Sequence, residues 1–378
     1  MSFAELGLSP LLTGVLAKMG LKTPTAIQKE VIPFVLAGKD VIAQSPTGTG
    51  KTFAFLLPLI ERLDLERGEP QALILAPTHE LVIQIHRQAE EIAKGGTLKL
   101  KSCPIIGNVN LERQIEKLKK DKPQLLIGSS GRLLELVQKK KINAPKIKTI
   151  VLDEADRLLA DNNFASVQAL IKTTLKERQL LLFSATLPPQ ILATARQLTP
   201  NAEEALIAAQ EKMPASISHW YFLCEEREKI ELLKKLTVHL KIKKALVFLN
   251  NSYALETMLA KLKFQGLLVD ALFGAAQKGE RQTALENFRR GKLDLLLTSD
   301  LGARGLDIPD TPYIFSLEAP EDPTLYLHRA GRTGRAGAKG TAISLITKNE
   351  LPLLAKMQKT LKIKIQQKTT SHGRIFEV

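Results

Sequence analysis

The segment AQSPTGTGKT, Ala43–Thr52, decides how the first half of this sequence folds. It follows the short apolar run Asp40–Gln44 and leads directly into the apolar stretch Phe53–Ile60, which has the character of a helix. Glycine adopts backbone angles that other residues avoid, so Gly48 and Gly50 allow successive backbone amides to point toward one anion. The N-terminus of the following helix adds a partial positive charge. The segment therefore predicts a phosphate-binding turn between a strand and a helix.

The side chains of this turn suit a nucleoside triphosphate bound with Mg²⁺. Lys51 supplies a cation to the outer phosphates, and the Thr52 hydroxyl is a suitable Mg²⁺ ligand. Ser45 stands where the general pattern has its first glycine, which makes the match imperfect. The alternative is a glycine-rich turn without a ligand, but the strand, the turn and the helix agree on a binding site. The residues expected to bind the nucleotide here are Ser45, Thr47, Gly48, Thr49, Gly50, Lys51 and Thr52.

A second segment, VLDEAD at Val151–Asp156, supplies the acidic groups that such a site needs. Asp153 directly follows an apolar strand, and ligands bind at the carboxyl ends of the strands in open α/β sheets. Its carboxylate suits Mg²⁺, and the neighbouring Glu154 suits the orientation or deprotonation of an attacking water. Taken alone, the segment is also compatible with a solvated helix start. Together with the phosphate turn, it predicts hydrolysis of a nucleoside triphosphate.

Short apolar runs alternate with amphipathic stretches such as Leu81–Ala93 along most of the chain, in two successive sets. The strands expected in the first set are Asp40–Gln44, Gln71–Ala76, Leu125–Gly128, Ile147–Leu152 and Gln179–Phe183. Those expected in the second set are Ala245–Asn250, Leu267–Leu272, Leu293–Thr298, Tyr313–Leu317 and Thr341–Ile346. Such continuous apolar runs are typical of strands buried on both faces of a parallel sheet. The fold class is therefore α/β, with two tandem domains, each a mostly parallel sheet with helices on both faces.

The boundary between the domains is expected where small and polar residues surround Pro214. This gives an N-terminal domain over residues 1–207, a linker over residues 208–215 and a C-terminal domain over residues 216–365. The remaining residues, 366–378, are polar without clear periodicity and are expected to form a short tail.

The charge balance of the chain favours a polyanionic partner. Lys and Arg outnumber Asp and Glu by 54 to 39, which gives a formal net charge of +15. Basic groups near phosphates release counterions on binding, although a soluble basic surface is the alternative. No apolar run is long enough to span a membrane, the first residues lack the order of a signal peptide, and Cys103 and Cys224 have no metal-type spacing. We expect a cytoplasmic protein with no membrane association, in which the cysteines are most simply reduced thiols, with a single disulfide as the alternative.

These segments resemble the motifs of the DEAD-box ATP-dependent RNA helicase family of superfamily 2, and the resemblance extends from Phe3 to about Gly340. The chain is similar to the compact, bacterial-type two-domain core of that family, which implies two RecA-like domains. GLKTPTAIQ, Gly20–Gln28, resembles the family's Q motif. The resemblance implies ATP as the nucleotide, with Phe3, Thr25 and Gln28 at the adenine. A carboxamide is suited to this because it both donates to and accepts from the adenine edge.

Two segments of the second half resemble family motifs that act on ATP from the second domain. HRAGRTGR, His328–Arg335, places three arginines among small residues, and the resemblance implies that two of them, Arg332 and Arg335, act as arginine fingers on the γ-phosphate. A basic turn that contacts RNA is the alternative. SDLGARGLD, Ser299–Asp307, implies contacts with the ribose. The residues implied are His328, Arg332 and Arg335 for catalysis and Gly305 and Asp307 for nucleotide binding.

The segment SAT, Ser184–Thr186, ends another strand. It resembles the family motif that couples hydrolysis to domain closure, and the resemblance implies that Ser184 and Thr186 do so together with Asp156. A hydroxyl cap at the start of the next helix is the alternative.

The resemblance also implies that a single strand of RNA binds across both domains. The residues expected to contact it are Pro77, Thr78, Gly107, Ser130, Gly131, Arg132, Arg281, Thr298 and Ser299. Several departures from the family pattern lie on this side. The family's PTREL appears here as PTHEL, with His79, and its double glycine appears as Gly107-Asn108. Its TPGR appears as SSGR, its TD as Ser299-Asp300, and Lys278 stands in the place of the usual glutamine. Most of them keep small, polar or cationic groups, so contacts to phosphate and sugar with little sequence preference remain possible.

The stretch Lys94–Lys148 is rich in lysine. It is expected either to strengthen electrostatic attraction near the segment Ser129–Arg132 or to form solvated helix faces.

The sequence thus predicts an ATP-dependent RNA helicase in which RNA stimulates Mg²⁺-dependent ATP hydrolysis, coupled to local unwinding of short RNA duplexes or to remodelling of ribonucleoprotein. Two alternatives stay open: an ATP-gated RNA clamp or assembly scaffold with weak unwinding, and a DNA translocase. The expected partners are single-stranded RNA or short duplexes, with possible protein partners, and the expected oligomeric state is a monomer.

Overall fold

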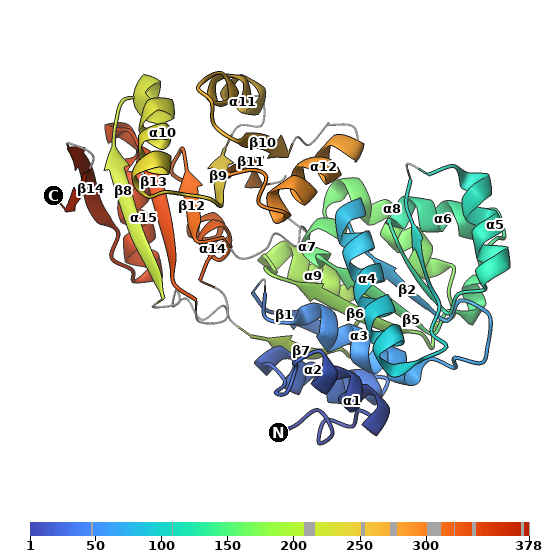
Figure 1. Ribbon diagram of the computed structural model, residues 1–378. Coiled ribbons are helices and arrows are strands. Elements are labelled where there is room, and N and C mark those ends of the chain that lie inside the picture. The colour runs from blue at the N-terminus through green and yellow to red at the C-terminus, as the bar shows by residue number, and fades with distance from the viewer. Residues whose placement is uncertain are drawn as a thin grey trace. The chain divides into compact units, whose positions relative to one another are not determined.

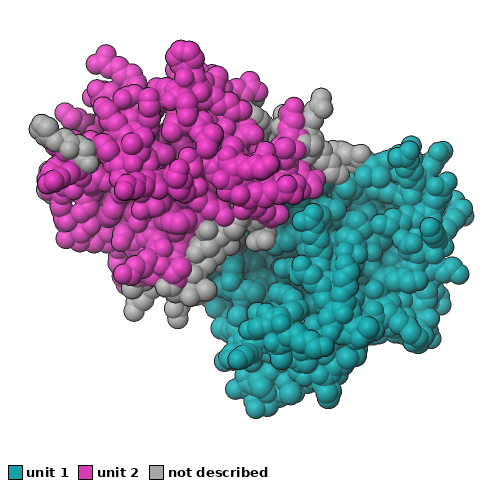
Figure 2. All heavy atoms as spheres, viewed as in Figure 1, with its two compact units in different colours: residues 1–209 teal, residues 210–378 magenta. Residues whose placement is uncertain are grey.

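The computed structural model describes residues 1–378 except 47, 108, 208–215, 251–253, 273–277, 301–310, 321, 335–337, 372–373 and 378, and except the side chains of residues 161, 162, 254, 278, 279 and 324. The chain divides into two compact units, Met1–Ala209 and Gln210–Val378, which are coloured separately in Figure 2. The linker expected over residues 208–215 lies outside the described residues.

Unit 1, Met1–Ala209, is built on a seven-stranded sheet in the order β3-β4-β2-β5-β6-β1-β7, in which neighbouring strands are parallel (Figure 1). The strands are β1 (Val41–Gln44), β2 (Ala72–Leu75), β3 (Ser102–Ile105), β4 (Leu125–Gly128), β5 (Thr149–Asp153), β6 (Gln179–Ser184) and β7 (Glu203–Leu206). Because the strands are parallel, the segments that follow them all emerge at one edge of the sheet.

Helices cover both faces of this sheet. One face packs against α1 (Pro10–Lys18), α2 (Ala26–Leu36), α3 (Lys51–Arg62) and α4 (His79–Gly96). The other packs against α5 (Leu111–Asp121), α6 (Ser130–Gln138), α7 (Ala155–Leu158), α8 (Asp161–Lys172) and α9 (Pro189–Leu198), and the short helix η1 (Ala144–Lys146) precedes β5. Strand β1 shows the alternation, since Val41 and Ala43 belong to the first core and Ile42 to the second.

Unit 2, Gln210–Val378, contains an eight-stranded sheet in the order β10-β11-β9-β12-β13-β8-β14-β15. The strands are β8 (Ile217–Leu223), β9 (Ala245–Leu249), β10 (Val269–Leu272), β11 (Leu295–Ser299), β12 (Tyr313–Ser316), β13 (Gly340–Ile346), β14 (Gln366–Ser371) and β15 (Arg374–Glu377). Neighbours are parallel except β14 and β15, which are antiparallel.

The helices of unit 2 also cover both faces of their sheet. One core contains residues of α10 (Lys229–His239) and α11 (Ala254–Phe264). On the other face, two cores contain residues of α12 (Lys278–Arg289), α14 (Pro323–Ala330) and α15 (Leu351–Leu361). The short helices η2 (Glu226–Glu228) and η4 (Lys348–Glu350) precede α10 and α15.

The architecture confirms the expected fold class, and each expected strand is present with its ends shifted by at most two residues. The strands β3, β7 and β8 were not predicted. The prediction of a polar tail after residue 365 is wrong, because β14 and β15 extend the sheet of unit 2, with Gln366 opposite Trp220 of β8. A hairpin at the edge of a sheet needs no continuous apolar run, so its sequence looks like a tail. Over the described ranges, no helix is long and apolar enough to cross a membrane.

Candidate functional site

The turn between β1 and α3 has the backbone that a phosphate-binding loop requires. Gly48 and Gly50 have φ angles of +80° and +88°, in the left-handed region that favours glycine. The side-chain oxygens of Ser45 and Thr49 lie 2.7 Å apart, and the Thr49 hydroxyl donates to the carbonyl oxygen of Pro46 over 2.7 Å. Ser45, which replaces the usual glycine, therefore helps to order the loop. Thr47 lies outside the described residues.

Lys51 and Thr52 are the first two residues of α3, directly after this loop. The Lys51 ammonium donates to the carbonyl oxygens of Ser45 and Pro46 over 2.5 and 2.9 Å. It is therefore held over the loop, where an anion bound by the loop amides would meet it.

Gln28 joins helix α2 to the same loop. Its side chain is 5% exposed, its Nε2 donates to the carbonyl oxygen of Gly50 over 3.1 Å, and its Oε1 accepts from the Thr25 amide over 2.9 Å. A Cβ on residue 50 would lie 2.5 Å from Nε2, so any other residue there would have to displace this carboxamide. Phe3 is a buried member of the core that contains α1 and α2. The roles of these residues at adenine stay predictions.

Asp153 and Glu154 lie at the same edge of the sheet. Asp153 is the last residue of β5, and the register places it opposite Phe183 of β6, which in turn lies opposite Ala43 of β1. Glu154 has a left-handed φ of +54° and precedes α7. This sharp turn separates the two adjacent carboxylates: Asp153 accepts a hydrogen bond from the Glu154 amide over 3.0 Å, whereas the Glu154 side chain pairs with Arg157 at 3.3 Å.

The electrostatics of Asp153 favour a bound cation. Burial, followed by the negative charge of Glu154, raises the pKa of Asp153 to about 7, although the Lys51 ammonium and the Glu154 amide act in the opposite direction. A buried carboxylate beside a second carboxylate is stabilised by a nearby cation. Oxygen donors from Asp153 and from Thr52 are the ligands that Mg²⁺ prefers, so these residues fit the metal.

A hydroxyl network connects β6 to the acidic segment. The Ser184 hydroxyl lies 2.7 Å from Oδ1 of Asp156, and the Thr186 hydroxyl donates to Oδ2 over 3.2 Å. The same Ser184 oxygen lies 2.6 Å from the carbonyl oxygen of Thr186. The structure thus brings together the three residues that the sequence grouped as coupling residues.

The loops expected to contact RNA in unit 1 follow β2, β3 and β4, which are neighbours in the sheet. Thr78 caps helix α4 with its hydroxyl, and the hydroxyl oxygens of Ser130 and Ser166 lie 2.6 Å apart. The Arg132 guanidinium donates to the carbonyl oxygen of Gly107, which ties the start of α6 to the loop after β3. Pro77 lies in the loop after β2, Gly131 is the second residue of α6, and His79 is the first residue of α4.

Unit 1 therefore presents both sets of predicted residues along one sheet edge. The residues expected to bind the nucleotide lie at or after the ends of β1 and β5, or in α2, which precedes β1. The residues expected to contact RNA follow β2, β4 and β3. Strand β2 lies next to β5, so the two sets meet at this boundary.

In unit 2, Arg329 joins the segments that follow three strands. It is 2% exposed, donates to both carboxylate oxygens of Asp300 over 2.8 and 2.5 Å, and donates to Oδ1 of Asn250 over 2.6 Å. It also donates to the carbonyl oxygen of Glu318 over 3.3 Å and lies 5.4 Å from the centre of the Phe248 ring. Asn250 follows β9, Asp300 follows β11 and Glu318 follows β12.

The other residues predicted in unit 2 lie in or just after α14, at the end of β11, on α12, or outside the described residues. Arg332 is 8% exposed, and its amide donates to the carbonyl oxygen of Arg329 over 3.1 Å. His328 lies in the last turn of α14. Thr298 and Ser299 are buried at the end of β11, and Arg281 is on α12, so their contacts with RNA stay predictions. Gly305, Asp307 and Arg335 lie outside the described residues.

Sequence reasoning did not predict Asn250 and Asp300 as the partners of Arg329. Both directly follow strands at the carboxyl edge of the sheet, which is the signal that identified Asp153 in unit 1. Applied to unit 2, the same rule would have found them.

Two tandem α/β units, the first with a phosphate loop and an acidic strand end, define a two-domain P-loop nucleoside triphosphatase. Comparison with known families is more specific. The model of the DEAD/DEAH box helicase domain matches residues 25–194, and the model of the helicase conserved C-terminal domain matches residues 228–337. With the relatives described next, these matches show that the chain belongs to the DEAD-box family of ATP-dependent RNA helicases.

Relatives and solved structures match nearly the whole chain. The DEAD-box ATP-dependent RNA helicase CshC of Bacillus cereus is 40% identical over 98% of this chain and 94% of its own, and the probable ATP-dependent RNA helicase YfmL of Bacillus subtilis is 40% identical over 94% and 93%. Dbp5 of S. cerevisiae bound to RNA and ADP BeF3 is 33% identical, with a TM-score of 0.85 over 97% of this chain and 95% of that one. Mss116p bound to ssRNA and AMP-PNP is 26% identical, with a TM-score of 0.83 over 97% and 78%.

Proposed function

We propose that this protein hydrolyses ATP in response to RNA and uses the cycle to open short RNA duplexes or to remodel ribonucleoprotein. The observation that supports this most directly is the placement of the nucleotide residues and the expected RNA loops along one edge of the unit 1 sheet. The relatives named as ATP-dependent RNA helicases, and the similar structures with RNA and nucleotide bound, support the same partners.

In unit 1, each nucleotide residue has a distinct task in this proposal. Gln28 and Thr25, with Phe3, recognise adenine, and the loop from Ser45 to Gly50 binds the phosphates through its amides. Lys51 leaves the loop carbonyls to neutralise the outer phosphates. This exchange is favourable because a phosphate oxygen carries more negative charge than a carbonyl oxygen.

Asp153 and Thr52 hold Mg²⁺ in this proposal, and the ion supplies positive charge to the reacting phosphates. Glu154 orients the attacking water and accepts its proton. The different contacts of the two side chains support this division of labour, because Asp153 accepts from the Glu154 amide whereas the Glu154 carboxylate pairs with Arg157.

Unit 2 contributes the arginines. We propose that Arg332 and Arg335, with His328 beside them, stabilise the charge that develops on the γ-phosphate, and that Gly305 and Asp307 hold the ribose. The contacts of Arg329 with Asn250 and Asp300 support Arg332 indirectly, because they hold the end of α14 from which Arg332 follows.

The RNA loops favour contact with phosphate and sugar rather than with base edges. Ser130 and Thr78 offer hydroxyls, Gly107 and Gly131 offer close approach of the backbone, and Arg132 offers positive charge. Binding with little sequence preference follows from these groups. Because the nucleic acid is read through its backbone, the 2′-hydroxyl is what would distinguish RNA from DNA.

Steady-state ATP hydrolysis, measured with single-stranded RNA, with DNA of the same sequence and without nucleic acid, tests the proposal. We expect stimulation by RNA and little by DNA. A rate that RNA does not change at any concentration would contradict the helicase proposal, and stimulation by DNA alone would support a translocase.

A second candidate is an ATP-gated RNA clamp with weak unwinding. It is favoured by the substitutions on the RNA side and by the state of Arg132, which keeps the family residue but whose guanidinium already donates to the Gly107 carbonyl oxygen. Strand displacement should be measured beside RNA binding in the presence of a non-hydrolysable ATP analogue. Tight analogue-dependent binding without displacement would identify the clamp.

The setting that we propose is a monomer in the cytoplasm, with protein partners that direct it to its RNA. Two free cysteines, Cys103 and Cys224, support a reducing compartment. Light scattering of the purified protein tests the oligomeric state.

A further inference from the structure

The lysine-rich stretch does not lie at the RNA loops. Residues 94–148 contain fourteen Lys and Arg and four Asp and Glu, a net charge of +10 out of +15 for the chain. Arg113 and Arg132 lie near the starts of α5 and α6, at the carboxyl edge of the sheet. The twelve lysines, however, occur at the ends of α4, α5 and α6 and directly before β3, β4 and β5. In a parallel sheet these places all belong to the amino edge, opposite the segment Ser130–Arg132.

All twelve of these lysines are exposed; they are Lys94, Lys99, Lys101, Lys117, Lys119, Lys120, Lys122, Lys139, Lys140, Lys141, Lys146 and Lys148. We call them the amino-edge lysines. Three of them pair with glutamates: Lys94 with Glu90, Lys99 with Glu66 and Lys146 with Glu69. The other nine have no ion pair within the described part of the chain. Uncompensated charge of one sign on three neighbouring segments attracts a polyanion.

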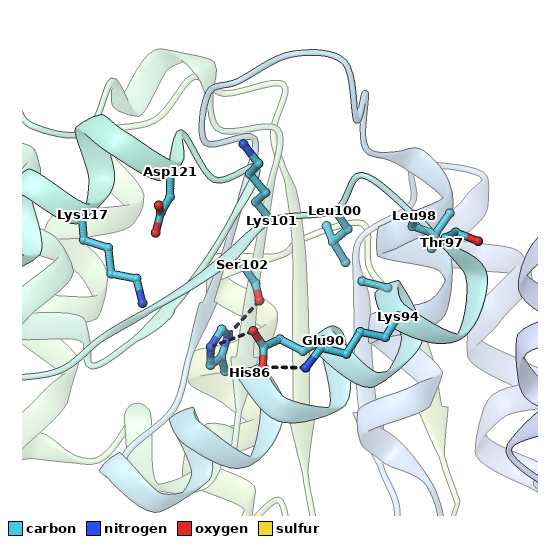
Figure 3. A pocket seen from close by; sticks show the side chains of 11 residues that line it. His86, Glu90, Lys94, Thr97, Leu98, Leu100, Lys101, Ser102, Lys117 and Asp121 are labelled. Carbon is cyan, nitrogen blue, oxygen red and sulfur yellow. Dashed lines mark hydrogen bonds and ion pairs between the residues drawn. The ribbon is translucent and has the colours of Figure 1, made fainter.

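Part of this surface is concave. A pocket of about 640 Å³ lies between α4, the start of β3 and α5, and Lys94, Lys101 and Lys117 contribute to its lining (Figure 3). Figure 3 shows the Lys117 ammonium pointing from α5 toward His86 and Ser102. The imidazole Nδ1 of His86 lies 2.8 Å from the Ser102 hydroxyl. The three lysines therefore surround a recess that also offers uncharged polar groups.

Two acidic side chains, Glu90 and Asp121, also line the recess. Burial lowers the pKa of His86, Lys117 and Lys94 lower it further, and Glu90 opposes them. His86 is therefore neutral near pH 7, and the lysines alone give the recess its positive charge. The excess of positive charge is larger outside the recess, where Lys119, Lys120 and Lys139–Lys141 lie.

The composition of this surface favours nucleic acid over a protein partner. Protein interfaces depend on aromatic, Met and Arg side chains around an apolar centre. Among the large hydrophobic residues that the structure describes as exposed, only Val109 belongs to the stretch 94–148, and it lies at the carboxyl edge. Lysine is a flexible point charge without the fork of arginine, which suits non-specific contact with phosphates.

We propose that the amino-edge lysines form a second binding surface for the phosphate backbone of RNA, separate from the loops that follow β2, β3 and β4. Helix α4 connects the two edges and its 18 residues span about 27 Å. Only an RNA longer than the one that the carboxyl-edge loops need would reach this surface. It would keep the enzyme on a long RNA while the loops release and rebind a short segment.

The test uses the full-length triple variant Lys101→Gln, Lys120→Gln and Lys141→Gln, which takes one unpaired lysine from each of three segments. The matched control is Lys356→Gln, Lys359→Gln and Lys364→Gln, three exposed lysines of unit 2. Affinity is measured between about 50 and about 200 mM salt for a long single-stranded RNA and for the shortest oligoribonucleotide that stimulates ATP hydrolysis. Each single-strand phosphate contact contributes about 0.7 to the slope of log affinity against log salt.

We expect the slope for long RNA to fall by about 2 in the test variant, with no change for the short oligonucleotide or in the control. Equal slopes in the test variant and the control would overturn the proposal. Unchanged RNA binding by the test variant, together with loss of its binding to polyglutamate, would also overturn the proposal. That result would assign the surface to an acidic protein. Because the inference rests on RNA as the partner, stimulation by the short oligonucleotide is measured in the unaltered protein. If the short oligonucleotide does not stimulate ATP hydrolysis by the unaltered protein, the proposed function itself is refuted. That outcome is thereby distinguished from a failure of the lysine surface alone.

Discussion

The hydroxyl group of Ser184 lies 2.7 Å from Oδ1 of Asp156, so the end of β6 is joined to the helix that follows Asp153 and Glu154. Thr186 binds the other oxygen of the same carboxylate over 3.2 Å. A change at the nucleotide, on the β5 side, can therefore move the segment after β6 through this carboxylate. That is the physical content of the coupling role proposed for these three residues.

Removing both hydroxyls, in Ser184→Ala with Thr186→Ala, should separate hydrolysis from unwinding. Hydrogen bonds to a charged group contribute about 1.5–3 kcal/mol each, so we expect RNA unwinding to fall by about tenfold or more. ATP hydrolysis with RNA should fall less, because Lys51, Asp153 and Glu154 are untouched. Both activities are measured in the same reactions, with Thr194→Ala on α9 as the control. Equal losses of the two would mean that the network serves hydrolysis itself.

Glu154→Gln should bind ATP and fail to turn it over. General acid–base catalysis contributes about two to four orders of magnitude, so kcat should fall by about 10² to 10⁴. Nucleotide affinity, measured by fluorescence of an ATP analogue, should stay within a few-fold. Glu204→Gln, which removes a surface carboxylate that pairs with Arg196, is the control. Full hydrolysis by the Glu154 variant would remove Glu154 from the mechanism.

Lys51 and Asp153 could be predicted because each belongs to a short segment that leaves the end of a strand in the sequence itself. Lys51 follows β1 through a glycine turn, and Asp153 ends β5. The contacts of Arg329 could not be predicted in this way. Asn250 and Asp300 are far apart in the chain, and they meet only because β9 and β11 pair in the sheet.

Two of the strands that were missed, β3 and β7, lie at the two edges of the unit 1 sheet, whereas β8 lies between β13 and β14. Strand β3 contains Pro104, and β7 contains two glutamates, Glu203 and Glu204. An edge strand has one side without a neighbour, so it tolerates proline and charge that a central strand excludes. The apolar runs that identified the central strands are therefore absent from these two. The same reason explains why the hairpin β14–β15 resembled a tail.

Arg329→Lys should destabilise unit 2 without altering nucleotide binding to unit 1. Lysine keeps the positive charge but loses the two-pronged contact with Asp300 and cannot also reach Asn250 and Glu318. A loss of about 2 kcal/mol is expected, which lowers the melting temperature by about 4–8 °C. Arg227→Lys, at an exposed arginine, is the control, and calorimetry is the measurement. An unchanged melting temperature would show that the contacts of Arg329 contribute little to stability.

Acid should destabilise unit 2 through one buried histidine. His219 of β8 is 6% exposed, its Nδ1 lies 2.9 Å from the hydroxyl of Tyr326 on α14, and burial lowers its pKa to about 4. An unfolded histidine titrates near 6.5, so between pH 6.5 and 4 the folded state binds fewer protons than the unfolded state. This contribution to stability is complete above pH 6.5 and decreases as the pH falls toward 4.

The difference between these two pKa values corresponds to about 3 kcal/mol. In His219→Gln the side chain can still bond to Tyr326 but does not titrate, so the variant should lose less stability than the unaltered protein on acidification. Urea unfolding at several pH values measures this. His239→Gln, at an exposed histidine of α10, should behave like the unaltered protein. Parallel stability profiles for the His219 variant and the unaltered protein would show that His219 does not set the acid sensitivity of the helix that holds His328 and Arg329.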